Sequence, residues 1–237
     1  LALEFMENNW SVKQLHRTIV FSKTYRQQSR SCEAGVIADP DNHTLWRQNV
    51  RRLDAETLRD SLLHVSGRLK PNGGGPAKWP EVPQELLYAQ PGIQEAIKGE
   101  DGGRMQGWLT SPEEETNVRS LYLVRKRCLP IPFLQAFDLP GTETSCARRD
   151  QTVVAPQALM LLNSPESMRS VQAFADRLLE GVDDSTLREK QVRHLMDKAF
   201  RLALCRAPED AERRIILQIL DQVEPQPDLQ SAALLLA

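Results

Sequence analysis

Arginine and acidic residues alternate between residues 47 and 60, and their spacing is the feature of the sequence best suited to chemistry. On one helix, Arg52, Glu56 and Asp60 would form a row at i, i+4 and i+8. Arg47, Arg51 and Arg59 would lie near a neighbouring line of the same helix. Guanidinium groups bind carboxylate, sulfate or phosphate bidentately, so a converging set predicts an anion-binding site. The same pattern is typical of structural ion pairs on a solvated helix face, and both interpretations stay open. The members of this cluster are Arg47, Arg51, Arg52, Arg59, Arg148 and Arg149.

General acid–base chemistry has three candidates in the same stretch, Glu56, Asp60 and His64. His64 follows Asp60 by four residues, which on a helix either orients the imidazole or forms an ordinary side-chain pair. No Ser or Cys nucleophile stands beside them in the sequence. These residues predict no particular reaction, and whether the chain is an enzyme stays open.

Metal and phosphate sites are not indicated by any motif. The four cysteines, Cys32, Cys128, Cys146 and Cys205, lie far apart and form no CxxC pair, so we expect separate thiols and no metal site. The glycine-rich stretch 72–76 lacks the GxxxxGK[ST] pattern of a phosphate loop and is interpreted as a turn. We therefore predict no cofactor in this chain.

Composition indicates a globular protein. Among 237 residues, 41% are hydrophobic, and 30 basic residues against 32 acidic ones give a formal charge of −2. This balance argues against a nucleic-acid partner, and no run approaches the about 18 apolar residues that span a bilayer. The chain begins within an amphipathic pattern and ends on an apolar run, so we expect one truncated domain.

Helical patterns dominate the chain. Ser11 and Gln14 have capping-box spacing ahead of a helix to about Tyr25, and Trp46, Val50 and Leu53 predict one long helix over 43–65. Gly67 is expected to end it, and Ser164 to begin another. Further helices are predicted after Ser111-Pro112 and over 156–162, 165–179, 186–204 and 208–223, whereas 120–124 could be strand or helix.

The predicted fold is mainly α, an irregular multi-helix domain with a long loop-rich insertion and at most a minor β element. We divide it into an N-terminal helical block 1–69, a loop-rich insertion 70–111 and a C-terminal helical block 112–237.

A series of sequence blocks extends along nearly the whole chain. In order they are 10–17, 22–27, Asp39-Pro40-x-Asn42, 51–60, Ser66-Gly67, 74–76, 119–122, Phe137-Asp138-x-Pro140, Arg148-Arg149-x-x-Thr152, 156–159 and Leu162-Asn163. This series resembles domain of unknown function 1553, a family found in large planctomycete proteins. The family's closing Asn-x-Glu-Phe-like motif is missing, and the segment 79–111 has no counterpart.

The resemblance implies a setting for the chain. Such proteins commonly carry a signal sequence, a cytochrome-c-like domain with a CxxCH motif and a second uncharacterised domain, which implies an extracytoplasmic location. This chain has no CxxCH, so a c-type haem would lie elsewhere in the polypeptide. The family has no established reaction to carry over.

Two functions remain in view. The first is a binding or scaffold module whose partners are the other domains of the polypeptide, with an anionic ligand or glycan as a further partner. The second is an enzyme domain acting on an anionic polysaccharide or another anionic substrate.

Overall fold

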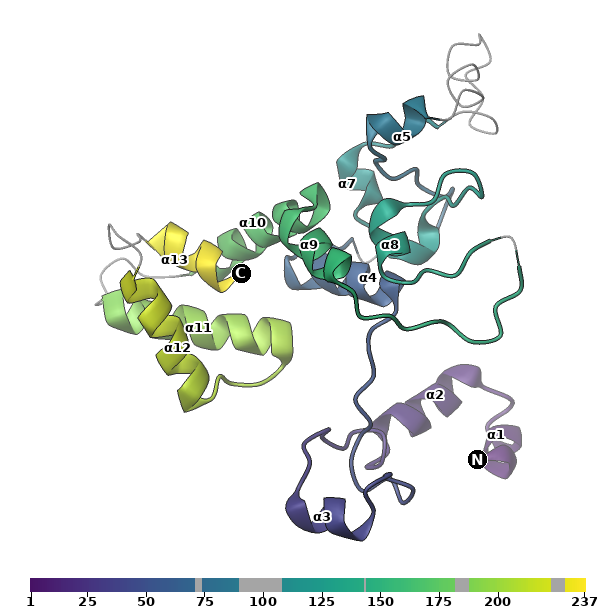
Figure 1. Cartoon of the computed structure of the whole chain (residues 1–237). Coiled ribbons are helices and arrows are strands. Elements are labelled where there is room, and N and C mark those ends of the chain that lie inside the picture. Colours follow the sequence, from purple (N-terminus) through teal and green to yellow (C-terminus); the bar gives the residue numbers. More distant parts are fainter. Residues whose placement is uncertain (71–73, 90–107, 143, 182–187, 223–228) are drawn as a thin grey trace. The chain divides into compact units, whose positions relative to one another are not determined.

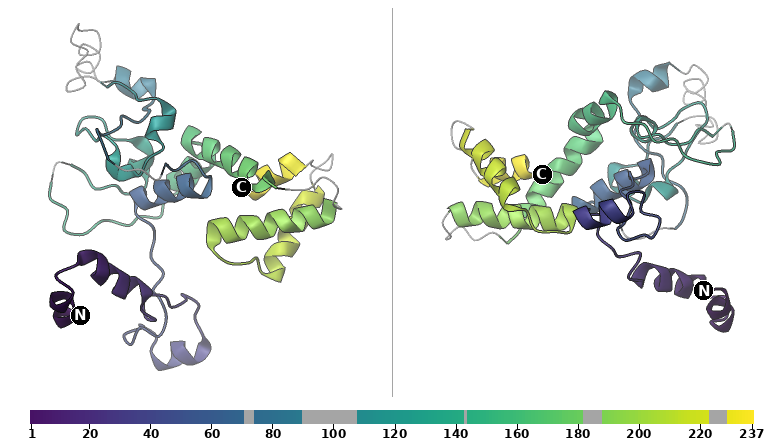
Figure 2. Two further views of the ribbon diagram at one scale, coloured as in Figure 1. Left: turned by 180° about the vertical axis from the view of Figure 1, so that it is seen from behind. Right: turned by 60° about the horizontal axis from the view of Figure 1, so that its bottom comes forward.

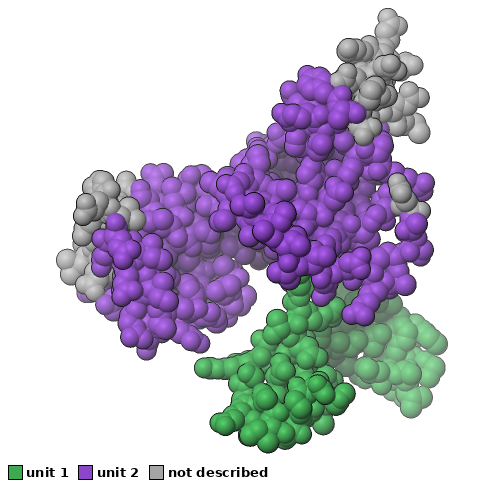
Figure 3. All heavy atoms as spheres, viewed as in Figure 1, with its two compact units in different colours: residues 1–52 green, residues 53–237 purple. Residues whose placement is uncertain are grey.

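The structure is a computed structural model that describes residues 1–70, 74–89, 108–142, 144–181, 188–222 and 229–237 (Figure 1). These residues form two compact units, 1–52 and 53–237 (Figure 3). The described elements are helices, accompanied by two isolated bridges, Lys78 to Leu123 and Lys126 to Leu129. The predicted mainly α fold is confirmed. No described helix is both long and apolar enough to cross a membrane.

The unit 1–52 contains α1 (Ala2–Glu7), α2 (Val12–Phe21) and α3 (Glu33–Ala38). The hydroxyl of Ser11 accepts a hydrogen bond from Gln14 N at 3.3 Å, which confirms the predicted start of α2. The helix ends before Tyr25 because Ser22 is extended and its hydroxyl accepts from Tyr25 N. None of the three helices buries a residue within this unit.

The predicted helix over 43–65 is wrong in its first half. The carboxylate of Asp39 accepts hydrogen bonds from His43 N and from Thr44 N and Oγ1. The buried amide of Asn42 bonds both N and O of Arg47. These side chains compete with the helix for backbone groups, and Asn42 adopts a left-handed φ of 57°. Within the predicted range 43–65, the helix is limited to α4 (Ala55–Val65), so the predicted apolar stripe of Trp46, Val50 and Leu53 does not form.

The unit 53–237 begins with α4 and continues as a series of short and then longer helices. Gly67 adopts a φ of 79° directly after the end of α4, as predicted. The segment 120–124, which could have been strand or helix, begins with a 3-10 turn. The further elements are α5 (Gln84–Tyr88), α7 (Glu113–Thr116), η1 (Ser120–Tyr122), α8 (Pro132–Ala136), α9 (Ala155–Asn163), α10 (Pro165–Leu179), α11 (Arg188–Leu204), α12 (Asp210–Gln222) and α13 (Leu229–Leu236).

Predicted helix positions hold in the second half of the chain. Ser164 caps α10 by accepting from Ser167 N, and Pro165 occupies its first turn. α9 and α12 match their predicted ranges within two residues at each end. Residues 186 and 187 of the predicted 186–204 helix lie outside the described residues, as do 71–73 and 90–107 of the loop-rich insertion.

The helix α10 joins two parts of the core. One cluster of buried side chains, including Ala55, Phe133 and Phe137, packs α4 against α8 and α9. A second cluster, including Phe174 and Leu178, packs α10 against α11 and α13 (Figures 1 and 2). Burying these apolar side chains provides the main stabilisation of the unit. The junction of α4, α8, α9 and α10 is where the candidate site lies.

Candidate ligand-binding site

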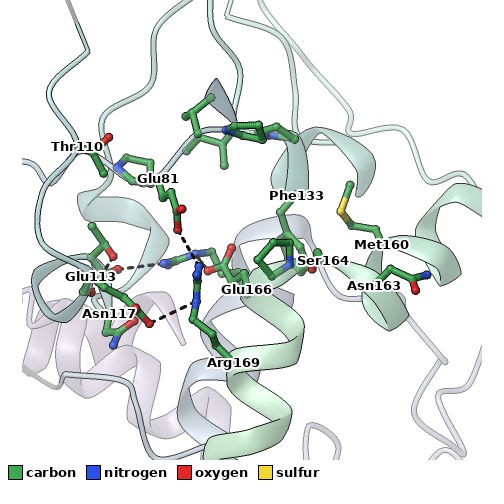
Figure 4. A pocket seen from close by; sticks show the side chains of 18 of the residues that line it. Glu81, Thr110, Glu113, Asn117, Phe133, Met160, Asn163, Ser164, Glu166 and Arg169 are labelled. Carbon is green, nitrogen blue, oxygen red and sulfur yellow. Dashed lines mark hydrogen bonds and ion pairs between the residues drawn. The ribbon is translucent and has the colours of Figure 1, made fainter. Parts of the chain in front are cut away.

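A cavity of about 920 Å³ opens in the unit 53–237 where six segments meet (Figure 4). The helix α4 contributes Arg59, and Arg68 follows directly after this helix. One wall is the segment that leads into α5, and another is α7 with the residues beside it. The start of α8, the helix α9 and the first turns of α10 complete the lining. The lining side chains used below are Arg59, Arg68, Glu81, Glu113, Asn117, Phe133, Leu159, Met160, Asn163, Glu166 and Arg169.

The wall that leads into α5 is held by two tryptophans. Trp79 and Trp108 pack edge to face with ring centroids 5.2 Å apart, and both are buried. The indole of Trp108 donates to Pro80 O, and Trp79 N donates to Ser111 Oγ. These contacts fix the backbone between 79 and 83. The sequence did not predict this small core, which lies within the loop-rich insertion.

Much of the cavity lining is apolar. Phe133 is buried at the start of α8, and Met160 packs beside the same core cluster from α9. Leu159 lies on the cavity side and is largely exposed, whereas Leu162 is exposed on the same helix and does not line the cavity. Five prolines, 80, 83, 132, 156 and 165, add rigid surface to the lining. An apolar lining with a few polar groups is the usual make-up of a small-ligand site.

Arg59 forms the innermost charged contact of the cavity. It follows Ala55 and precedes Leu63 on the buried face of α4, and its side chain is only 4% exposed. Its Nε donates to Glu166 Oε1 at 2.6 Å, and its two Nη atoms donate to the carbonyls of Val118 and Thr116 at 3.0 Å. The guanidinium therefore joins α4, the turn after α7 and α10.

A second layer of ion pairs lies nearer to solvent. Arg68 donates to a carboxylate oxygen of Glu113 and to Oδ1 of Asn117. Arg169 donates from Nη2 to Glu81 Oε2 at 3.0 Å, and its Nε lies 3.4 Å from Glu113 Oε1 (Figure 4). The Nε contact is an ion pair without hydrogen-bond geometry within the described part of the chain. Three arginines and three glutamates thus balance each other around the cavity.

Two of the predicted residues form a separate pair on the surface of the same unit. Arg149 donates from both Nη atoms to the carboxylate of Glu56, at 2.5 and 3.0 Å, and Asp54 lies 4.0 Å away. Partial burial raises the pKa of the Glu56 carboxyl, but the hydrogen bonds from Arg149 and the charge of Arg125 outweigh it, so the pKa lies below its ordinary value. The hydrogen bonds to Glu56 likewise raise the pKa of Arg149. Neither member of the pair lines the cavity.

Asp60 and His64 are not brought together as an acid–base pair. Asp60 accepts from both N and Oγ of Ser120 at 2.7 Å, and Arg119 lies 3.7 Å away. His64 is exposed in the last turn of α4, where its carbonyl accepts from Arg177. None of the hydrogen bonds or ion pairs shown for the described residues joins the two side chains. Asp60 instead fixes η1 to α4.

The remaining arginines of the predicted cluster have different surroundings. Because 43–54 is not helical, the predicted line of Arg47, Arg51 and Arg59 is wrong. In the unit 1–52, the guanidinium of Arg47 lies 5.2 Å from the ring centroid of Trp46, Arg51 is exposed and Arg52 is half-buried. Arg148 is exposed in the segment before α9. Their predicted anion-binding role stays a prediction.

Metal-binding side chains do not gather in the described part of the chain. No group of three or more His, Cys, Asp or Glu residues there could hold an ion. The four cysteines are free and exposed.

A triplet that occurs twice in the sequence contains two of the glutamates that line the cavity, and the sequence analysis did not identify it. Ser-Pro-Glu occurs at 111–113 and again at 164–166. In both cases the proline lies at a helix start and the glutamate in the first turn, and each glutamate pairs with an arginine from α4 or directly after it. The sequence shows the repeat, but the partners Arg59 and Arg68 are too far away along the chain to be inferred from it.

Comparison with known proteins gives one match. The model of a family described as "PSD1: Protein of unknown function (DUF1553)" matches residues 1–220. No curated protein and no solved structure matches the chain. The match covers the unit 1–52, the unit 53–237 as far as residue 220, and every element that lines the cavity.

Proposed function

This chain belongs to the PSD1 family of proteins of unknown function (DUF1553), and we propose that it is a ligand-binding module with the cavity between α5 and α10 as its site. The observation that carries the proposal is an open, largely apolar cavity of about 920 Å³, bordered by a charge-balanced set of side chains. Small-ligand sites commonly have volumes of about 300–1,000 Å³ and a similar lining.

The alternative, an enzyme acting on an anionic polysaccharide or another anionic substrate, has less support. Such an enzyme needs accessible cations beside a poised acid or base. The guanidiniums of Arg59 and Arg149 are bound to Glu166 and Glu56. The carboxylate of Asp60 accepts hydrogen bonds from N and Oγ of Ser120. The Arg59–Glu166 pair is better explained as a structural contact that holds elements around the cavity together, and the Arg149–Glu56 pair as a surface ion pair.

The cellular setting is a further part of the proposal and rests on the resemblance of sequence blocks described above. We place the module in a multidomain, extracytoplasmic polypeptide whose other domains are its partners, one of them a c-type haem domain. Fractionation of cells producing the full-length polypeptide, followed by haem staining, tests this. A haem-stained band outside the cytoplasm is expected. A full-length polypeptide that is retained in the cytoplasm or does not stain would contradict it.

A pair of substitutions on α9 tests the binding site. Leu159→Glu places a charge on the cavity lining, whereas Leu162→Glu places the same charge on an exposed position outside it. We suggest screening neutral, cationic and anionic organic fragments by ¹H–¹⁵N NMR of the chain. Hits are expected to shift the amides of Phe133, Met160 and Asn163, to bind Leu162→Glu normally and to lose binding to Leu159→Glu.

The proposal is contradicted if fragments of every charge class leave these amides unshifted. Hits that bind Leu159→Glu as well as the unmodified chain would also contradict it, because their site would then lie elsewhere.

A further inference from the structure

The basic side chains around the cavity are on the whole less exposed to solvent than the acidic ones. The side chains of Arg59 and Arg68 are only 4% and 13% exposed. The side chains of Glu81 and Glu113 are 66% and 52% exposed. A ligand that enters from solvent therefore meets carboxylate oxygens first, although the whole set is balanced. Arg169, at 37% exposed, is the most exposed of the three arginines.

The buried guanidiniums cannot turn to an incoming anion without loss of structure. Arg59 uses Nε and both Nη atoms on Glu166 and on two backbone carbonyls. Arg68 uses its Nη atoms on Glu113, Asn117 and Ser170. Releasing Arg59 would leave its buried guanidinium and the carbonyls of Thr116 and Val118 without their hydrogen bonds, and releasing Arg68 would leave a largely buried guanidinium unpaired. This cavity is therefore poorly suited to an anionic ligand.

The polar groups that remain suit a peptide. Asn117 and Asn163 lie at opposite sides of the cavity in Figure 4. Asn117 accepts from Arg68 through its Oδ1, so its Nδ2 can donate to a peptide carbonyl. Asn163 donates from its Nδ2 to Leu159 O, so its Oδ1 can accept from a peptide N–H. Phe133 and Met160, between and beside them, provide apolar surface for side chains.

We infer that the occupant of this cavity is a short peptide segment in which a Lys or Arg is flanked by apolar residues. Its cationic side chain lies against Glu81 and Glu113, its apolar side chains lie on Phe133 and Met160, and one of its carbonyls accepts from Nδ2 of Asn117. This inference rests on the proposed function, because it names the class of ligand for the same site.

The test is a titration of the chain with capped hexapeptides of leucine and proline that contain one Lys, one Gln or one Glu at the same position, followed by calorimetry. The Lys peptide is expected to bind about threefold to fivefold more tightly than the Gln peptide, as partly exposed ion pairs allow, and the Glu peptide more weakly than either. Hexylamine, which has the cation without the backbone, is expected to bind more weakly than the Lys peptide.

Matched variants locate the cation. Glu81 is largely exposed, so Glu81→Gln leaves the fold intact, and it is expected to remove most of the preference for Lys over Gln. Glu85→Gln is the control, because Glu85 lies one turn further along the same segment and outside the cavity lining. Equal binding of the Lys and Glu peptides, a preference that survives Glu81→Gln, or hexylamine binding as tight as the Lys peptide would overturn the inference.

These outcomes are distinct from failure of the proposed function. If the Gln or Glu peptide binds the unmodified chain at least as well as the Lys peptide and loses binding to Leu159→Glu, the cavity is a ligand site and the inferred cation is wrong. If no peptide or fragment binds there, both statements fail.

Discussion

Arg59 and Glu166 lie 107 positions apart in the sequence and form an ion pair of 2.6 Å between Nε and Oε1 at the inner end of the cavity. The same guanidinium donates to Val118 O and Thr116 O. One side chain thus joins α4, α10 and the turn after α7. The cavity depends on this contact because its lining comes from all three segments.

Arg59→Ala is expected to destabilise the chain by about 3–5 kcal/mol, because it leaves a carboxylate and two carbonyls without their partner. Urea unfolding followed by far-UV circular dichroism measures the change. Arg148→Ala, an exposed position in the same unit, is the control and is expected to change stability by less than about 0.5 kcal/mol. A similar small effect for both variants would contradict the structural role of Arg59.

Arg149→Ala is expected to cost only about 0.2–1 kcal/mol, because the side chain is 40% exposed and solvent and salt screen its pair with Glu56. The loss should shrink as salt concentration rises. Unfolding free energies of the two proteins at low and high salt check this. A loss comparable to that of Arg59→Ala would show that the surface pair holds the fold, contrary to our expectation.

Glu212 provides a prediction for pH. Two hydrogen bonds from Arg206, with a third from Glu209 N, lower the pKa of Glu212 to about 2 from an ordinary 4.5. Since the folded state binds this proton less readily than the unfolded state, the stabilisation is fully present above pH 4.5 and is lost as the pH falls towards 2. Carboxyl chemical shifts titrated by NMR measure the pKa, and Arg206→Gln is expected to return it towards its ordinary value. An unchanged pKa in that variant would contradict the assigned cause.

A substitution at Gly35 tests the structure of the loop 43–54, which lies where a helix was predicted. A Cβ atom at this position would lie 2.7 Å from the ring of Trp46, whose indole donates to Asp39 O. Gly35→Ala is therefore expected to displace the ring, at a cost of about 1–3 kcal/mol, and to shift the Trp46 indole N–H resonance. Gly141→Ala, with open space around its Cβ position, is the control. An unshifted Trp46 resonance in Gly35→Ala would contradict the described loop.

Local signals account for most of what the sequence predicted. Ser11, Ser164 and Gly67 act through hydrogen bonds or backbone conformations within a few residues, so their patterns could be read directly. The prediction for 43–54 is wrong for a local reason too. The side chains of Asp39 and Asn42 bind backbone groups of residues 43, 44 and 47 that a helix would have used.

The cavity could not be predicted in the same way. Its contacts join Arg59 to Glu166, and Glu81 to Arg169, across large separations in sequence. A single sequence carries no record of which distant charges meet. The predicted cluster did contain Arg59, but grouping it with Arg47 and Arg51 relied on a helix that does not form.

The most direct test of the central claim is an experimental structure of the chain with the strongest-binding fragment or peptide. We predict that the ligand lies in the cavity with its apolar part on Phe133 and Met160, and with the Arg59–Glu166 pair intact beneath it. A ligand bound outside this lining, or a cavity filled by the chain's own side chains, would contradict the assignment of this site.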